Sequence, residues 1–194
     1  MRLRVMTGLL LSAALCAQIA AAEPVETAAP AGSNRELADI YNADQGDRRA
    51  GKIDWAVVTP RDQQRQARVR ELAASGALKT SADFHHAAMV YQHGSTPEFY
   101  KQAQLWAQRA VELDAGNDGA RWLAAAAEDR YLINTGKPQI WGTQYTKPHP
   151  AKEWTMEPFD RQAKTDAERI AQKVQTLAQS QARLDSMNAT LKQP

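Results

Sequence analysis

The stretch from Ala82 to Gln144 determines the predicted fold and reads ADFHHAAMVYQHGSTPEFYKQAQLWAQRAVELDAGNDGARWLAAAAEDRYLINTGKPQIWGTQ. It divides into three segments in which apolar residues recur at helical spacing, with Thr96 and Pro97 opening the second segment. The third segment, from Ala120 to about Thr135, is apolar nearly all round, so we expect a central helix covered by others. No part of the chain alternates apolar and polar residues as a strand does. The sequence therefore predicts an all-α fold, a compact bundle of antiparallel helical hairpins.

Further helices are predicted on both sides of this stretch. Ser33 and Glu36 form a capping box that opens one helix, and Thr59 followed by Pro60 opens the next. Ser81 and Asp118 are the predicted caps within the central stretch. Residues 137–158 contain four prolines and are expected to form an ordered loop. The predicted organisation is a signal peptide at 1–22, a flexible leader at 23–32, a helical domain at 33–159 and one long C-terminal helix at 160–194.

The first residues have the composition of a signal peptide. Arg2 and Arg4 precede an apolar run, and small alanines end at Ala22, after which we expect cleavage. The mature protein is therefore predicted to be periplasmic or secreted. Cys16, the only cysteine, lies inside the signal peptide, so the mature chain is expected to contain no disulfide and no reactive thiol.

The charge balance argues against several classes of partner. Without Arg2 and Arg4 the chain has 22 basic and 22 acidic residues, hence a formal net charge of zero. Nucleic acid and anionic membrane surfaces are therefore not expected as partners. No later apolar run is long enough for an integral membrane segment. The remaining length suits one domain of about 150 residues.

Charged residues lie on the inward stripes of the first two predicted helices. Asp44 and Arg48 continue an apolar stripe, and Asp62 and Arg65 open another. Buried charges are tolerated when they are paired, so one interpretation is a structural ion-pair network that ties several helices together. The residues proposed for this network are Asp44, Arg48, Asp62, Arg65, Arg121, Asp129 and Arg130.

The central stretch resembles a known repeat. The segments YKQA at 100–103 and AQRAVELD at 107–114 resemble the second helix of a tetratricopeptide or Sel1-like repeat, where small alanines let helices approach closely. The resemblance extends from Phe84 to Tyr131, about one and a half repeats. It implies a compact domain with repeat-like hairpins and no long array.

A second resemblance covers most of the mature chain. Its motifs are DQGDR at 44–48, DQQR at 62–65, QHG at 92–94, ARWL at 120–123, DRYL at 129–132 and GKPQIWGTQ at 136–144. They resemble a bacterial family catalogued as a domain of unknown function. The resemblance implies a shared fold and a shared polar set, and it supplies no reaction.

Acid–base chemistry is the one catalytic possibility that the residues leave open. His93 is the candidate acid–base residue, with Asp44 or Asp129 as a nearby carboxylate. The four histidines (His85, His86, His93 and His149) lack the i, i+4 spacing of a helical metal site. No Gly-x-Ser-x-Gly elbow and no Gly-rich phosphate loop occurs. We expect neither a metal site nor a cofactor, and the sequence does not decide whether the protein is an enzyme.

The candidate ligand-binding set consists of amides, arginines, one tryptophan and one threonine. They are Gln92, Arg121, Arg130, Gln139, Trp141, Thr143 and Gln144. The main hypothesis is an exported helical-hairpin protein that binds a protein, a peptide or a small polar ligand in a groove lined by Trp141, Gln144 and Tyr145. One alternative is a small cofactor-independent hydrolase or lyase that uses His93 with a carboxylate. Another is a cell-envelope immunity or assembly factor that makes its contact through the long C-terminal helix.

Overall fold

The computed structural model describes residues 32–49, 52–148 and 150–191. These residues form the helices α1 (Arg35–Arg49), α2 (Trp55–Ala74), α3 (Ser81–Gln92), α4 (Pro97–Leu113), α5 (Asp118–Asn134), α6 (Asp166–Ala171) and α7 (Leu177–Thr190). No strand occurs within these ranges, which confirms the predicted all-α fold. None of these helices is both long and apolar enough to cross a membrane. The predicted signal peptide, all but the last residue of the predicted leader, and His149 lie outside the described residues.

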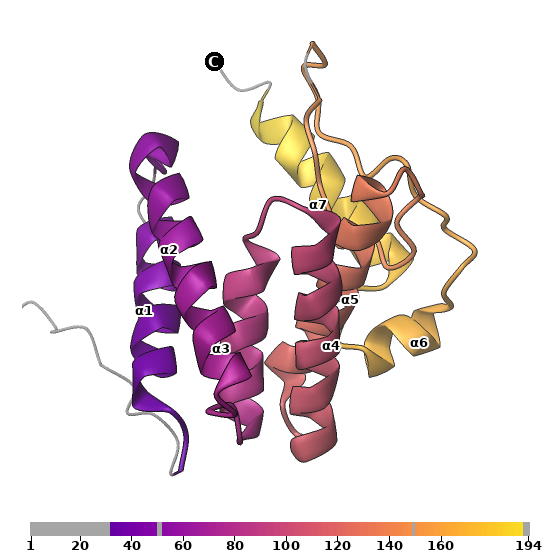
Figure 1. The fold of residues 1–194 in the computed structure, drawn as a ribbon. Helices are drawn as coiled ribbons and strands as arrows, with labels where there is room; N and C mark the ends of the chain where they lie inside the picture. The colour runs from indigo at the N-terminus through magenta and orange to yellow at the C-terminus, as the bar shows by residue number, and fades with distance from the viewer. Residues whose placement is uncertain (1–31, 50–51, 149, 192–194) are drawn as a thin grey trace, which may run out of the picture.

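The helices α1 to α5 form a bundle in which helices adjacent in sequence pack side by side (Figure 1). The pairs α3–α4 and α4–α5 make the most extensive contacts, and α1 and α2 pack on each other and on α3. Small side chains permit this close packing: Ala87, Ala88, Ala103 and Ala107 have no exposed surface. The alanines from 124 to 127 in α5 are at most 4 % exposed, so α5 is a covered helix, as its sequence predicts.

The start of α2 differs from its prediction. The helix begins at Trp55, where the side chain of Asp54 accepts a hydrogen bond from the Ala56 N–H. Pro60 therefore lies inside the helix and not at its first turn. The interior proline is tolerated because Ala56, whose carbonyl loses its usual N–H partner, is exposed to water.

Three predicted caps are displaced by one residue. Asn34, not Ser33, accepts the hydrogen bond from the Leu37 N–H at the start of α1. Thr80, with Asp83, forms the capping box of α3. Asn117 caps α5. Asp and Asn compete with Ser at this position with nearly equal preference, so sequence alone does not fix the register. The predicted Thr96–Pro97 start of α4 is confirmed.

The prediction of a single long C-terminal helix is wrong. The chain forms two short helices, α6 and α7, and each opens with a capping box, at Thr165 with Glu168 and at Thr176 with Gln179. Between them Lys173 adopts a φ of 61°, which a continuous helix does not allow. The assembly-factor alternative relied on one long helix, which residues 150–191 do not form.

The loop that follows α5 is ordered, as predicted. Thr146 and Thr155 exchange backbone hydrogen bonds of 2.9 and 2.8 Å, and Gln139 binds the backbone of Pro158 and Asp160 in the same way. These pairings fold the loop back on itself beside α5. The helices α6 and α7 follow this loop in the chain (Figure 1).

Candidate functional site

Asp44 and His93 form a buried pair between α1 and the end of α3. The Asp44 side chain has no exposed surface, and His93 Nδ1 lies 2.9 Å from its Oδ2 and 3.1 Å from its Oδ1. Because an ionised carboxylate only accepts, Nδ1 is the nitrogen that carries the hydrogen. Nε2 is left as the nitrogen that can act on another group, which is the arrangement expected of an oriented general base.

A chain of ion pairs continues from Asp44 into α2. Arg48 Nη1 lies 3.0 Å from Asp44 Oδ1, and Arg48 Nη2 lies 2.5 Å from Asp62 Oδ2. Arg65 contacts Asp62 at 2.8 Å and also binds Asp47. Each of these buried or half-buried charges therefore has an opposite charge, as the predicted structural network requires. The carboxylate that orients His93 is part of this network.

The other charges assigned to the network do not join it. The Arg121 guanidinium donates to the carbonyl of Ala115 at 2.6 Å. Arg130 donates to the carbonyl of Gln92 at 2.7 Å and to Gln144 Oε1 at 3.0 Å. Neither arginine forms an ion pair with a carboxylate in the described part of the chain, so the network is smaller than the predicted set of seven residues.

Asp129 is fully buried and holds the loop that follows α5. Its carboxylate accepts hydrogen bonds from the N–H groups of Ile140, Trp141 and Thr143 and from the Thr143 hydroxyl, at 2.8 to 2.9 Å. Burial raises the pKa of Asp129, and the hydrogen bonds from Trp141 and Thr143 oppose that rise. With its oxygens occupied by the loop, Asp129 has a structural role and is not a partner of His93.

Most of the predicted binding residues also serve this loop. Gln139 donates to the carbonyls of Gln144 and Met156 and accepts from the Gln144 N–H. Trp141 is 8 % exposed, and its Nε1 donates to Glu128 at 2.7 Å. Trp141 therefore does not line the expected groove.

A smaller part of that set does line a pocket. A pocket of about 260 Å³ lies between α4, α5 and the loop. Its lining residues are Tyr100, Arg130, Ile133, Asn134, Gln144, Tyr145 and Thr146. Arg130 and Gln144, from the predicted set, and Tyr145 thus reach a common cavity, but both polar groups are already engaged with each other.

His85 and His86 lie together against the Tyr41 ring. The rings of Tyr41 and His86 stack with centroids 4.3 Å apart. Burial, with a smaller contribution from the His86 charge, lowers the pKa of His85 to about 4, and burial also lowers the pKa of His86. No group of three or more potential metal ligands occurs among the described residues. The neutral imidazoles therefore act as packing residues of the bundle.

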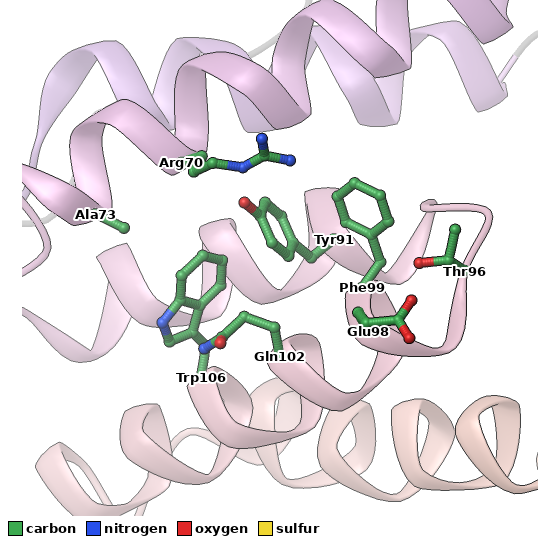
Figure 2. A pocket seen from close by; sticks show the side chains of 8 residues that line it. All are labelled: Arg70, Ala73, Tyr91, Thr96, Glu98, Phe99, Gln102 and Trp106. Atoms are coloured by element: carbon green, nitrogen blue, oxygen red, sulfur yellow. The ribbon is translucent and has the colours of Figure 1, made fainter.

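The largest of the pockets described here lies between α2, α3 and α4 and has a volume of about 450 Å³. Its lining residues are Arg70, Ala73, Tyr91, Thr96, Glu98, Phe99, Gln102 and Trp106. Figure 2 shows the rings of Tyr91, Phe99 and Trp106 gathered beneath Arg70. Tyr91 meets Phe99 edge-on with ring centroids 5.0 Å apart, and Trp106 at 4.5 Å. The pocket is an aromatic cup with polar groups at its rim.

The polar rim of this aromatic cup has two electrically different ends. Arg70 reaches over the rings from α2 and forms no ion pair with any described residue, and Glu98 lies beside Thr96 at the other end (Figure 2). A hydrogen bond from Thr96 is the main cause that lowers the pKa of Glu98. The hydroxyl of Tyr91 likewise has no hydrogen-bond partner in the described part of the chain. The cup therefore offers an apolar floor, unpaired donors at one end and an acid at the other.

The aromatic cup was not predicted. The helical spacing of Phe99 and Trp106 predicts only that they share the inward face of their helix, and nothing in the sequence singles out Arg70. His93 lines none of the pockets described here.

Comparisons of the chain with protein-family models, with curated proteins and with solved structures find no match. No relative therefore assigns a reaction or a ligand to these pockets. The contacts, pocket volumes and charges of the chain itself are the observations that bear on its function.

Proposed function

We propose that this chain is an exported, repeat-like helical-hairpin protein that binds a peptide through the aromatic cup between α2 and α4. An apolar side chain of the peptide occupies the floor of the cup, and a carboxylate beside it pairs with Arg70. The observation that carries the proposal is a cup walled by aromatic rings with an unpaired arginine above it (Figure 2).

The volume and the walls of the cup favour an apolar group. A cavity of about 450 Å³ lies within the range of about 300 to 1,000 Å³ that is usual for ligand sites. Tyr91, Phe99 and Trp106 have few rotatable bonds, so a ligand that packs on their partly buried rings orders them at small entropic cost. Tyr91 is only 5 % exposed, so the core beneath it holds this ring in place.

The rim supports a ligand with a negative group at one end. A guanidinium without a partner offers up to five donors, and a carboxylate matches its fork. Glu98 repels a second acid at the far end of the cup, so the ligand enters with its carboxylate towards Arg70. A peptide with an apolar residue next to an acid, or ending in an apolar residue, meets both requirements.

The test uses simple probes that carry the two groups. N-acetyl-leucine and N-acetyl-phenylalanine, and their uncharged amide forms, are titrated into the ¹⁵N-labelled mature chain. We expect saturable shifts of the backbone signals of Tyr91, Phe99 and Gln102. The acids should bind about three- to fivefold more tightly than the amides, because an exposed charge pair contributes at most about 1 kcal/mol.

Two matched variants separate the arginine from general charge. Arg70→Gln should make the acid and amide forms bind equally. Arg109→Gln removes an arginine from the exposed surface of α4, where it pairs with Glu112, and should preserve the preference for acids. Absence of saturable shifts with every probe, or an identical preference in both variants, would refute the proposal.

A second candidate function rests on the Asp44–His93 pair. A histidine whose Nδ1 is held 2.9 Å from a buried carboxylate can act as a general base through Nε2, as a small hydrolase or lyase requires. The screen is turnover of p-nitrophenyl acetate and p-nitrophenyl phosphate. A catalytic His93 predicts a loss of about 100-fold or more in His93→Gln. Equal turnover by the wild type and by His93→Gln would show that His93 is not catalytic and that Asp44 and His93 form a structural pair.

A further inference from the structure

The pocket of about 260 Å³ between α4, α5 and the loop after α5 shares no lining residue with the aromatic cup. Its walls combine the side chain of Arg130 with those of Tyr100, Ile133 and Tyr145, and none of the described residues that line it is acidic. The pocket therefore places one positive charge beside an apolar surface. Neither of the functions considered above uses it.

No carboxylate of the described residues neutralises the charge of Arg130. Its Nη1 donates to the carbonyl of Gln92 at 2.7 Å and its Nε to Gln144 Oε1 at 3.0 Å, and both acceptors are uncharged. Burial is the main cause that lowers the pKa of Arg130; Tyr100 opposes this shift, and the charge of Arg48 adds to it. A partly buried cation without an anion is costly, so a bound anion would stabilise this side chain.

The guanidinium of Arg130 borders the pocket directly. Arg130 lines the pocket together with Gln144, which accepts from Nε, and with Tyr100, whose ring centroid lies 6.0 Å from Arg130 Cζ. Nη2 donates to none of the described residues, and Nη1 keeps a second hydrogen beyond the one that Gln92 accepts. A carboxylate in the pocket can therefore form the two parallel hydrogen bonds that match the end of a guanidinium fork.

The walls of the pocket are held in place by contacts within the protein. The Tyr100 hydroxyl donates to the carbonyl of Gly94 at 2.8 Å, and Tyr100 is only 7 % exposed. The Tyr145 hydroxyl donates to the carbonyl of Ser180 at 3.3 Å. Arg130 is fixed by its two hydrogen bonds to neutral acceptors. A ligand thus meets side chains that are already ordered, which lowers the entropic cost of binding.

We propose that this pocket binds a small monocarboxylate with an apolar body, of about the size of benzoate. The carboxylate pairs with Arg130, and the apolar body packs between Tyr100, Ile133 and Tyr145. The volume is about nine times the share of one water molecule in the liquid, which leaves room for one ring and its carboxylate. An inorganic anion such as phosphate reaches Arg130 but leaves the apolar walls without a partner, so it binds more weakly.

The experiment titrates benzoate, its neutral analogue benzamide and inorganic phosphate into the ¹⁵N-labelled mature chain, at ionic strength held constant with chloride. Only signals at this pocket are read, because benzoate also meets the requirements of the aromatic cup. We expect benzoate to shift the backbone signals of Asn134, Gln144 and Thr146 saturably. It should bind there about tenfold more tightly than benzamide, because a hydrogen-bonded charge pair at a partly buried guanidinium contributes more than an exposed one.

Two variants with the same charge change test the role of the arginine. Arg130→Gln should make benzoate and benzamide bind this pocket equally. Arg109→Gln, on the exposed surface of α4, should keep the preference for benzoate. Arg130 also binds the last carbonyl of α3, so the ¹⁵N spectrum of Arg130→Gln must first show that this variant folds.

A measurement on the wild type locates the ligand without any substitution. Nuclear Overhauser contacts should join the ring protons of benzoate to the methyl groups of Ile133, which line the pocket. The proposal is overturned by absence of saturable shifts at the three signals, by equal binding of benzoate and benzamide to the wild type, or by phosphate binding as tightly as benzoate. A preference for benzoate that persists in folded Arg130→Gln, or absence of contacts to Ile133, would overturn it as well.

Discussion

Two buried aspartates in this molecule are stabilised by different kinds of partner. Asp44 in α1 meets two side chains, Arg48 from its own helix and His93 from the end of α3. Asp129 in α5 meets the backbone of a single loop, through the N–H groups of residues 140, 141 and 143. The first arrangement joins helices and depends on which side chains are present. The second depends on the course of the backbone, so it fixes the path of a loop.

The largest effect is expected at Asp129, where the partners cannot be changed by substitution. Asp129→Ala leaves three buried N–H groups and the Thr143 hydroxyl without an acceptor. We expect a loss of about 3–5 kcal/mol in the free energy of unfolding, measured by urea denaturation. Asp129→Asn keeps the shape and one acceptor oxygen and should lose less. A melting temperature unchanged in Asp129→Ala would contradict the loop-holding role.

A smaller effect is expected at Asp44, where a second substitution can compensate. Asp44→Asn leaves Arg48 and His93 with a weaker partner and should cost about 2–3 kcal/mol. Changing Arg48 to Met in the same chain removes a cation that has lost one of its two carboxylate partners and should restore part of that loss. Strictly additive losses in the double-mutant cycle would show that Asp44 and Arg48 are not coupled.

Acid should weaken the N-terminal helices through their histidines. Burial lowers the pKa of His85 to about 4, below its ordinary value in an unfolded chain, so the folded state favours the neutral ring. The stability from this group is present above about pH 6.5 and is lost as the pH falls from there towards 4. We expect a loss of about 1–2 kcal/mol, because the ring is partly exposed. In His85→Gln the melting temperature should vary less across this window than in the wild type.

The smallest effect is expected at an exposed ion pair that joins α1 to α2. Arg68 meets Glu36 at 2.6 Å and Glu71 at 2.5 Å, but all three side chains are about half exposed or more. Solvent screens such pairs, so Arg68→Ala should lower the melting temperature less than Asp44→Asn does. A loss as large as that of Asp44→Asn would mean that burial does not distinguish the two kinds of pair.

The sequence predicted the helical stripes better than the helix ends. Leu37, Val69 and Leu72 are buried as their spacing indicates, because periodicity reports which face turns inward. The predicted start of α2 is too late, because Pro60 is typical of a helix N-terminus but is tolerated inside this helix, where the carbonyl of Ala56 is open to water. The break between α6 and α7 had a signal in the sequence, the capping boxes at Thr165 and Thr176, which the polar composition of the region obscured.

The candidate sites were harder to predict than the fold. Asp44 and His93 were both named from the sequence, but their contact joins positions far apart in the chain, which no single sequence specifies. Arg70 was missed because an exposed arginine in a helix carries no distinguishing pattern. What marks it is a guanidinium beside a cavity without an ion-pair partner among the described residues, and this property exists only in the folded chain.

The order of contacts in the bundle has a consequence for how the chain folds. The helices α3, α4 and α5 pack chiefly on their neighbours in sequence, so their contacts close short loops and form quickly. The Asp129 carboxylate must instead capture amides more than ten residues away, after α5 exists to present it. Substitutions in α4 should therefore change the folding rate, while Asp129→Asn should mainly speed unfolding.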